Sequence, residues 1–198
     1  MAKNMQPVLK RCRTLGVSPA AMGYSKTSTK NPGGQRRAKK SEYATQLTEK
    51  QKVKFVYGIL EKQFHTLYEK AESMKGNTGE NLLSLVERRL DNVVYRLGYA
   101  STRREARQLV NHGHYTVNGK RVNIPSYTVN VGDAIAVCEN SCSNNRFKKM
   151  KEDDAFIAAP KWLERDKNTL SGKVIALPAR DDIDFEIAEN LIVELYSK

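Results

Sequence analysis

The sequence of 198 residues contains no run of about 18 apolar residues, so we expect no membrane-spanning helix. Its first residues, 1–6, lead into a basic stretch and lack the apolar segment of a secretory signal, which predicts a cytoplasmic protein. Cysteine is also scarce: an odd number, three, in a reducing compartment argues against a disulfide framework.

The cysteines do not form a recognisable metal-binding motif. A structural zinc ion requires four nitrogen or sulfur ligands. Cys12 stands alone in its region, and Cys138 and Cys142 have only each other, with His112 and His114 some distance upstream. We therefore expect reduced thiols, no metal and no cofactor.

Acidic residues are scarce in the first quarter of the chain. Residues 1–50 contain eleven Lys or Arg and two acids, whereas residues 151–198 contain seven and eleven, and the whole chain has a net charge of +12. Such clustering of positive charge favours a polyanionic partner. A surface for acidic lipids is the rival interpretation, but no amphipathic basic helix rich in Trp and Leu supports it.

Residues 1–44 also have few apolar side chains, and Pro19 and residues 31–34 interrupt any long helix. Residues 35–40 form a dense cationic run. An isolated run of this kind is usually a solvated tail, but here the whole surrounding segment is basic. We therefore interpret residues 1–44 as an extended basic arm that becomes ordered on a phosphate backbone.

Helical periodicity extends from residue 45 to residue 75, where apolar residues recur at steps of three and four. Thr48 with Gln51 is typical of a capping box at the start, and Gly58 predicts a break into two helices. A further helix is predicted from residue 78 to Gly98, with a single apolar stripe.

Short β-prone runs follow between residues 117 and 137. The polar residues 139–153 are interpreted as a loop with room for a short helical turn. A strand is predicted at residues 173–177 and a last helix at residues 183–196. The predicted fold class is α+β, a helical domain with a small, mainly antiparallel sheet.

The clearest functional pattern lies in residues 102–122. Thr102 and Glu105 can form a capping box, so a helix should begin there, run to His112 and end at Gly113. At about 3.6 residues per turn, this helix separates into two faces. The apolar face, expected in the core, contains Ala106, Leu109 and Val110. The opposite face, rich in hydrogen-bond donors, contains Arg104, Arg107, Gln108 and Asn111, with Arg103 at its flank.

The donor face favours a ligand over solvent alone. Guanidinium groups bind phosphate oxygens bidentately and stack on bases. Ordinary solvated faces mix both signs of charge, whereas Glu105 is the only acid from Thr102 to Val131. Asn118-Gly119 predicts a type I′ hairpin turn, and Lys120 and Arg121 follow it directly. A helix and a cationic hairpin together suit structured RNA, which is recognised largely by shape and backbone.

From residue 88 to residue 137 the chain resembles the alpha-L RNA-binding domain. The matching stretches are 89–98 (RLDNVVYRLG), 104–110 (REARQLV), 112–113 (HG), 117–119 (VNG), 125–127 (PSY) and 131–133 (VGD). This domain also occurs in pseudouridine synthases, a tRNA synthetase and ribosome-rescue factors, so the domain alone leaves the function open.

The flanking segments resemble the family of bacterial small-subunit ribosomal protein number four. The similar stretches are 41–43 (SEY), 47–52 (LTEKQK), 57–58 (YG), 76–82 (GNTGENL) and 191–197 (LIVELYS). This resemblance implies a basic arm (1–44), a helical domain (45–88, completed by 160–198), an alpha-L domain (89–153) and a C-terminal segment (154–198) that packs on the helical domain.

The family resemblance also implies a role without catalysis. It implies direct, early binding of 16S rRNA at a multi-helix junction of the 5′ domain, and nucleation of the small-subunit body. It places the chain, as a monomer, at the mRNA entrance beside the third and fifth small-subunit proteins, with an effect on accuracy. The candidate rRNA contacts are Lys10, Arg11, Arg13, Arg103, Arg104, Arg107, Gln108, Asn111, His112, Lys120 and Arg121. The cations that match the part of the family facing incoming mRNA are Arg36, Arg37 and Lys39.

The chain departs from the family pattern in its arm. Many members hold four N-terminal cysteines around zinc, whereas this chain keeps only Cys12 there, so it resembles the zinc-free form. The family often has Pro-Gly-Gln-His-Gly before the cationic run, where residues 32–35 here are Pro-Gly-Gly-Gln.

Two other classes of protein remain as alternatives. An RNA-modifying enzyme with an alpha-L domain needs a separate catalytic domain, and the acids Asp181, Asp182 and Asp184 have neither a Gly-rich loop nor His partners. A free regulatory or rescue factor is the second alternative. The helical flanks argue against it, and the acidic C-terminal part favours a protein neighbour in a larger particle.

Overall fold

The computed structural model describes residues 6–26, 41–152, 159–166 and 169–197, without the side chains of residues 151–152. It divides the chain into two compact units: residues 1–83 with 183–198, and residues 84–182. Within the described ranges, no helix is both long enough and apolar enough to cross a membrane.

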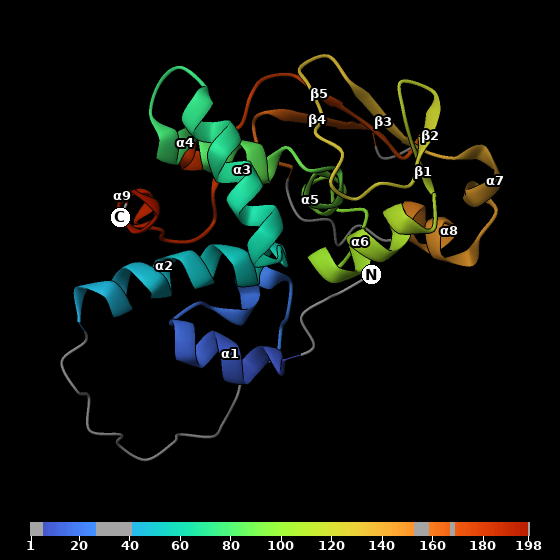
Figure 1. Cartoon of the computed structure of the whole chain (residues 1–198). Helices are drawn as coiled ribbons and strands as arrows, with labels where there is room; N and C mark the ends of the chain where they lie inside the picture. Colours follow the sequence, from blue (N-terminus) through green and yellow to red (C-terminus); the bar gives the residue numbers. More distant parts are fainter. Residues whose placement is uncertain (1–5, 27–40, 153–158, 167–168, 198) are drawn as a thin grey trace. The chain divides into compact units, whose positions relative to one another are not determined.

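The first unit is helical (Figure 1). It contains α1 (Val8–Leu15), η1 (Pro19–Met22), α2 (Glu42–Tyr57), α3 (Glu61–Ser73), the first part of α4 (Thr78–Glu87) and α9 (Glu189–Tyr196). The start of α2 is capped by Ser41, whose Oγ accepts a hydrogen bond from the Ala44 amide. The predicted capping box at Thr48 is therefore wrong, because Thr48 lies inside the helix and donates to the Ala44 carbonyl. The break at Gly58, which has φ 63°, is confirmed.

The described part of the predicted extended arm is folded. Cys12 and Leu15 of α1 are buried, as is Met22 of η1, and Arg11 donates to the Gln51 side chain of α2. The expectation of an extended arm is therefore wrong for residues 8–22. These residues form two helices, and several of their few apolar side chains are buried in the first unit.

The second unit combines helices and a sheet. Its elements after α4 are α5 (Leu90–Arg96), α6 (Arg103–Asn111), β1 (Tyr115–Val117), β2 (Lys120–Val122), β3 (Ala134–Val137), α7 (Glu139–Cys142), α8 (Asn145–Glu152), β4 (Leu163–Asp166), β5 (Ser171–Val174) and η2 (Arg180–Asp182). The strands form an antiparallel sheet in the order β2-β1-β3-β5-β4. The predicted α+β class is confirmed.

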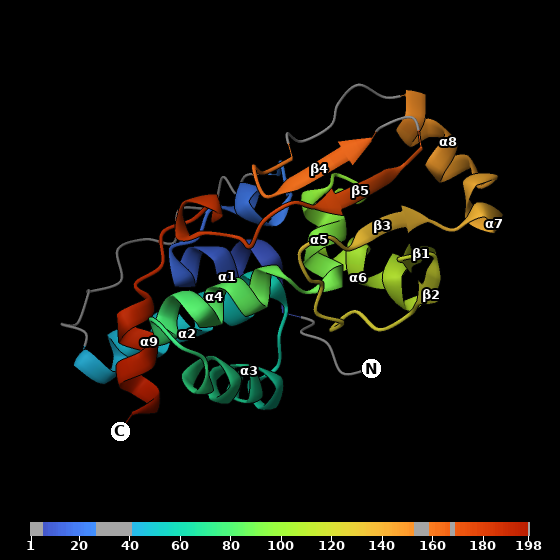
Figure 2. The ribbon, with the colours of Figure 1, turned by 90° about the horizontal axis from the view of Figure 1, so that it is seen from above.

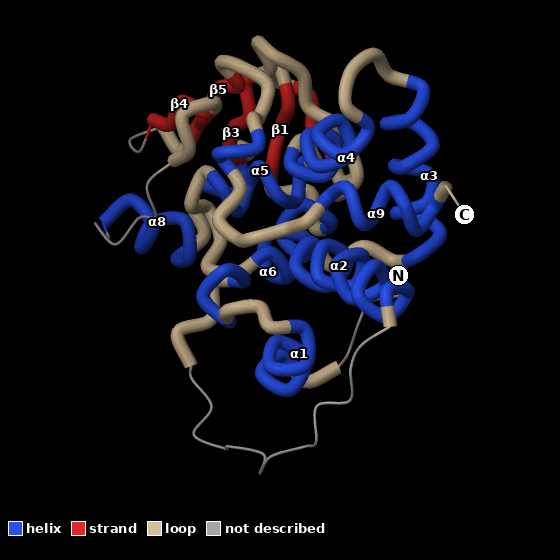
Figure 3. The backbone as a smooth tube through the Cα atoms, turned by 90° about the vertical axis from the view of Figure 1, so that its left-hand side faces the viewer, coloured by secondary structure: helices blue, strands red, loops and turns tan. Residues whose placement is uncertain are grey.

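The core of this unit lies between the sheet and its helices. Figure 3 shows the strands gathered in one layer with α5 beside it. The buried cluster joins Leu90 and Val94 of α5, Val110 of α6, and Ile135 and Val174 of the sheet. Helix α6 is thus fixed to the sheet by its apolar face.

Helices α4 and α5 replace the single long helix predicted from residue 78. At Arg89 the backbone is extended, with φ −66° and ψ 136°. The Leu90 amide donates to the Tyr127 carbonyl at 2.8 Å, and the Asp91 amide donates to the Pro125 carbonyl at 3.2 Å. These bonds to a distant loop replace bonds within a helix, so tertiary structure overrides the apolar stripe.

Three other expectations for the C-terminal half are corrected. Residues 139–152 form α7 and α8 where a loop was predicted, and Figure 2 shows both near the end of β3. The expected C-terminal segment 154–198 does not pack as one piece, because β4 and β5 pair in the sheet and residues 183–198 belong to the first unit. The last helix begins at Glu189, later than predicted.

Candidate nucleic-acid interface

The local sequence fixes the start of α6. The Thr102 hydroxyl accepts a hydrogen bond from the Glu105 amide at 3.2 Å, and the Glu105 carboxylate accepts one from the Ser101 amide at 2.7 Å. This reciprocal arrangement satisfies amides that have no partner inside the helix. The predicted cap is therefore confirmed, with the carboxylate reaching one residue farther back than Thr102.

The predicted division of α6 into two faces also appears, with two exceptions. Ala106, Leu109 and Val110 are buried, as expected. The exposed residues of the helix and its C-cap are Arg104, Gln108, Asn111 and His112. Arg103 and Arg107, which were assigned to the donor face or its flank, make contacts inside the protein.

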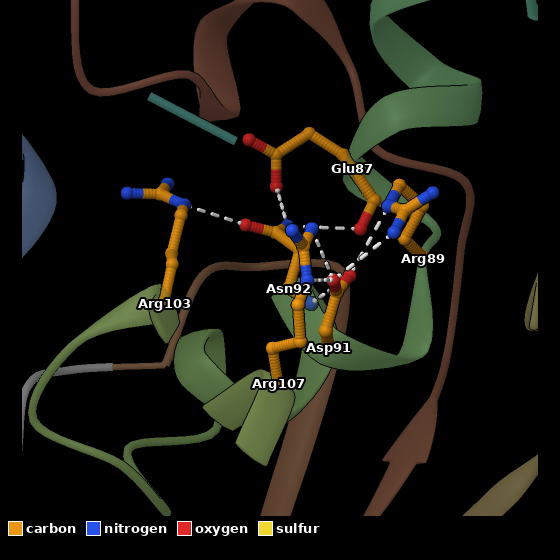
Figure 4. Close-up of polar contacts among 6 residues, drawn as sticks. All are labelled: Glu87, Arg89, Asp91, Asn92, Arg103 and Arg107. Carbon is orange, nitrogen blue, oxygen red and sulfur yellow. Dashed lines mark hydrogen bonds and ion pairs between the residues drawn. The ribbon is translucent and has the colours of Figure 1, made fainter. Parts of the chain in front are cut away.

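Arg107 forms an ion pair with Asp91 of α5 (Figure 4). Its Nε and its Nη2 each lie 2.7 Å from Asp91 Oδ2. The same carboxylate pairs with Arg89, whose Nε and Nη2 donate at 3.1 and 3.0 Å, and it accepts from the Asn92 amide. Arg107 therefore joins α6 to the start of α5.

Arg103 is buried, with 6% of its surface exposed. Its Nε donates to Asn92 Oδ1 at 2.8 Å, and its guanidinium lies 4.4 Å from the centre of the Tyr95 ring. Figure 4 shows Asn92 between Arg103 and Glu87, to which the Asn92 amide group donates at 2.6 Å. Glu87, fully buried, also pairs with Arg96 at 2.7 Å. This network fixes α6 against α5 and does not belong to the exposed surface.

The hairpin forms as predicted and is tied to the end of α6. Asn118 and Gly119 have φ 50° and 77°, as a type I′ turn requires. Lys120 is exposed. Arg121 donates from Nε to the Gly113 carbonyl at 2.7 Å and from Nη2 to the His112 carbonyl at 3.1 Å. A cation is favourable at the C-terminus of a helix, where carbonyl groups lack partners.

Asn118 has a second role that its turn propensity did not reveal. Its Oδ1 accepts from the Ala134 amide at 2.9 Å, and its Nδ2 donates to Asp133 Oδ1 at 2.8 Å. The side chain therefore connects the hairpin tip to the start of β3. Only the spacing of the Asn-Gly and Gly-Asp turns could have suggested this contact.

The surroundings of His114 show that the local charge is positive. Burial lowers the pKa of His114, and its interactions with His112, Arg121 and Arg146 lower it further. His114 Nδ1 lies 3.0 Å from the Ser141 hydroxyl of α7. Arg121 and Arg146 thus place positive charge near His114, next to the end of α6 and the hairpin.

The remaining candidate residues lie elsewhere. Lys10 and Arg13 are exposed on α1, and Arg11 is half-buried against α2; all three belong to the first unit. The predicted mRNA-facing cations Arg36, Arg37 and Lys39 fall outside the described residues.

The cysteines are free thiols in the described structure. Burial raises the pKa of Cys12, and burial also raises the pKa of Cys138, against the opposing charge of Arg121. Among the described residues, no group of three His, Cys, Asp or Glu side chains is placed to hold a metal ion.

Comparison with known proteins identifies the family of both halves. Residues 88–135 match the model of the S4 domain, and residues 3–87 match that of the ribosomal protein S4/S9 N-terminal domain. The small ribosomal subunit protein uS4 of Fusobacterium nucleatum is 52% identical over 198 residues, covering 100% of both chains. The uS4 of Caldicellulosiruptor saccharolyticus is 57% identical, again over 100% of both chains. The uS4 of Clostridioides difficile is 61% identical over 83% of this chain and 79% of its own. The chain therefore belongs to the uS4 family of small ribosomal subunit proteins, which are structural constituents of the ribosome and not enzymes.

Proposed function

We propose that this chain binds 16S rRNA directly, at a multi-helix junction of the 5′ domain, and nucleates assembly of the small-subunit body. The exposed face of α6 carries the proposal, because it presents Arg104, Gln108 and Asn111 on a rigid support. The one acid of this helix, Glu105, is paired with Arg146 and does not repel phosphate. Neutral and cationic donors on a fixed element suit the backbone of folded RNA.

The predicted contacts on α6 and the hairpin fall into two groups by their exposure. Arg104, Gln108, Asn111, His112 and Lys120 are exposed and are proposed to touch rRNA. Arg103 and Arg107 are proposed to position α6 through Asn92 and Asp91. Arg121 combines the two roles, since it is exposed but holds the end of the helix.

The first experiment measures binding to 5′-domain rRNA as a function of salt. Arg104→Ala with Arg107→Ala should weaken binding and reduce the salt slope, by about 1 for each phosphate that the protein no longer neutralises. Arg104→Ala alone should account for the change in slope without a change in the free energy of unfolding, because its side chain is exposed. Unchanged affinity and slope in a folded double variant would contradict the assignment.

The place of the chain in the particle is proposed from the family resemblance. It lies at the mRNA entrance, beside the third and fifth small-subunit proteins, and contributes to accuracy there, with Arg36, Arg37 and Lys39 facing incoming mRNA. Tagged protein from a cell lysate should sediment with the small subunit. Its absence from that fraction would favour a free factor that uses the same RNA-binding domain.

A further inference from the structure

Helix α8 extends the second unit beyond the residues that match the S4 domain model, which end at residue 135. Its anchor is Phe147, which is fully buried. The centre of the Phe147 ring lies 5.7 Å from the centre of the His114 ring and 6.2 Å from the centre of the Tyr115 ring. Met150 packs against the same core. Aromatic burial of this kind docks α8 against the start of β1.

One side of α8 faces α6. Arg146 of α8 pairs with Glu105 of α6, with 2.5 Å between Nη1 and Oε1. Residues three apart lie on the same side of a helix, so Lys149 follows Arg146 on the side toward α6, while Phe147 and Met150 face the core. Lys149 is exposed. The exposed surface of α8 next to Arg146 is therefore cationic.

The donor face of α6 leads around the helix toward Glu105, which pairs with Arg146 of α8. At about 100° per residue, Gln108 and His112 lie between the line of Glu105 and the line of Arg104 on α6. Both are exposed. Around α6 from Arg104, the order is thus Gln108 with His112 and then Glu105, whose partner Arg146 belongs to α8.

The acid within this surface is neutralised. Glu105 accepts from Arg146 and from the Ser101 amide, and these contacts lower its pKa although burial raises it. The ionised form of this carboxylate is therefore stabilised by Arg146 and by the Ser101 amide. On α8 itself, Lys148 and Lys149 are exposed, and the exposed Asn144 and Asn145 precede them.

We propose that Lys148 and Lys149 of α8 bind phosphate groups of the same rRNA that the donor face of α6 contacts. The inference rests on the proposed function, and it adds a second helix to the RNA-binding surface. Lysine ammonium groups bind phosphate as point charges and need no particular base, which suits a helix beside the main contact.

An acidic protein is the other polyanion that could occupy this surface, and the composition of α8 disfavours it. The centre of a protein interface is usually enriched in aromatic residues, Met and Arg and depleted in Lys. Among the described side chains of α8, those exposed are polar or cationic, while Phe147 is buried and Met150 packs inward. The surface therefore lacks the apolar anchor of a protein contact.

The test uses the full chain and 5′-domain rRNA over a range of salt concentrations. Lys148→Gln with Lys149→Gln should reduce the salt slope by about 1 to 2 and weaken binding at about 0.1 M salt roughly tenfold, since each phosphate that loses its lysine retains a counterion. Lys148→Arg with Lys149→Arg should keep the affinity, because the charge is conserved. Far-ultraviolet circular dichroism and urea unfolding should show that both variants are folded like the parent.

A matched control removes two exposed lysines elsewhere in the same unit, Lys161→Gln with Lys173→Gln. An equal loss in this control would show a general charge effect and overturn the proposal. Parent-like affinity and slope in the Lys148/Lys149 variant would also overturn it, as would reduced incorporation into particles with unchanged RNA affinity, which would indicate a protein partner. If the parent protein itself does not bind the rRNA, the proposed function fails first.

Discussion

Arg107 of α6 and Asp91 of α5 form an ion pair in which Nε and Nη2 of the arginine both lie 2.7 Å from Asp91 Oδ2. The carboxylate is almost fully buried, and it also receives two hydrogen bonds from Arg89. The position of Arg107 on the helix predicted a contact with RNA, but this arginine is part of the support beneath the proposed RNA-binding face. Breaking this pair should consequently affect the stability of the second unit.

Replacing Asp91 should destabilise the second unit strongly. Asp91→Ala leaves two guanidinium groups without their carboxylate, and Arg89 is buried. Removing one partner of a buried ion pair costs about 3–5 kcal/mol because the remaining charge stays buried and unpaired. Urea unfolding monitored by circular dichroism should show this loss.

The matched control is Glu69→Ala, which removes the partner of His65 in an exposed pair on α3. An exposed pair of this kind contributes at most about 0.5 kcal/mol, so the unfolding midpoint should hardly move. If Asp91→Ala changed stability as little as Glu69→Ala, the buried network would not be what holds α5 and α6 together.

A second prediction concerns two glycines with positive φ near the hairpin. Gly113 has φ +72°, and a Cβ there would lie 2.5 Å from Arg121 Nε; Gly119 has φ +77° and open space. Gly119→Ala should cost about 1 kcal/mol from the backbone alone. Gly113→Ala should cost about 1 kcal/mol more, because Arg121 must leave the carbonyl groups that it caps.

The same pair of variants separates stability from binding. Gly113→Ala should weaken rRNA binding more than Gly119→Ala, since it displaces Arg121 at the end of the donor face. Comparable unfolding free energies and rRNA affinities for the two variants would show that the approach of Arg121 to Gly113 has no energetic weight.

Local signals in the sequence predicted the parts of the site that depend on neighbouring residues. The cap at Thr102 and the turn at Asn118 are set by contacts within a few positions, and both formed as expected. Arg107 was misassigned because its partner, Asp91, lies on another helix, and helical periodicity describes only the helix on which a residue lies. The same limit explains why the sequence does not predict α8. Phe147 has no apolar neighbour at helical spacing except Met150, and the side chains that bury it include His114 and Tyr115, which are distant in the sequence.

A third prediction is a loss of stability in acid that depends on Glu61. Partial burial would raise the pKa of this carboxyl, but hydrogen bonds from Lys54, Lys50 and Tyr196 outweigh it and lower the pKa to about 2. A carboxyl with a lowered folded-state pKa stabilises the fold above its unfolded pKa, and this contribution is lost as the pH falls through the folded value. The loss should therefore occur between pH 4.5 and about 2.

Urea unfolding of the parent and of Glu61→Gln, compared at several pH values, isolates this contribution. The difference in the free energy of unfolding between the two proteins should narrow as the pH falls below 4.5, the ordinary pKa of this carboxyl. Tyr196→Phe removes one of the three donors to Glu61. The difference in unfolding free energy between the parent and this variant should also narrow with falling pH, but by a smaller amount. If the difference in unfolding free energy between the parent and Glu61→Gln stays constant with pH, the lysines do not stabilise the ionised carboxylate.

The last prediction tests whether Asn118 is present for its backbone conformation or for its side chain. Gly is the residue that adopts φ 50° with least strain, so Asn118→Gly should be neutral or slightly stabilising if the turn alone mattered. The side chain, however, accepts from the Ala134 amide and donates to Asp133. Losing both bonds at an exposed position should cost about 1 kcal/mol net, and hydrogen exchange of the Ala134 amide should accelerate. Asn118→Asp keeps the acceptor for Ala134 but places a carboxylate against Asp133, so it should be at least as unstable. A fully stable Asn118→Gly variant with slow exchange at Ala134 would mean that the backbone ladder of β1 and β3 holds the hairpin tip without the side chain.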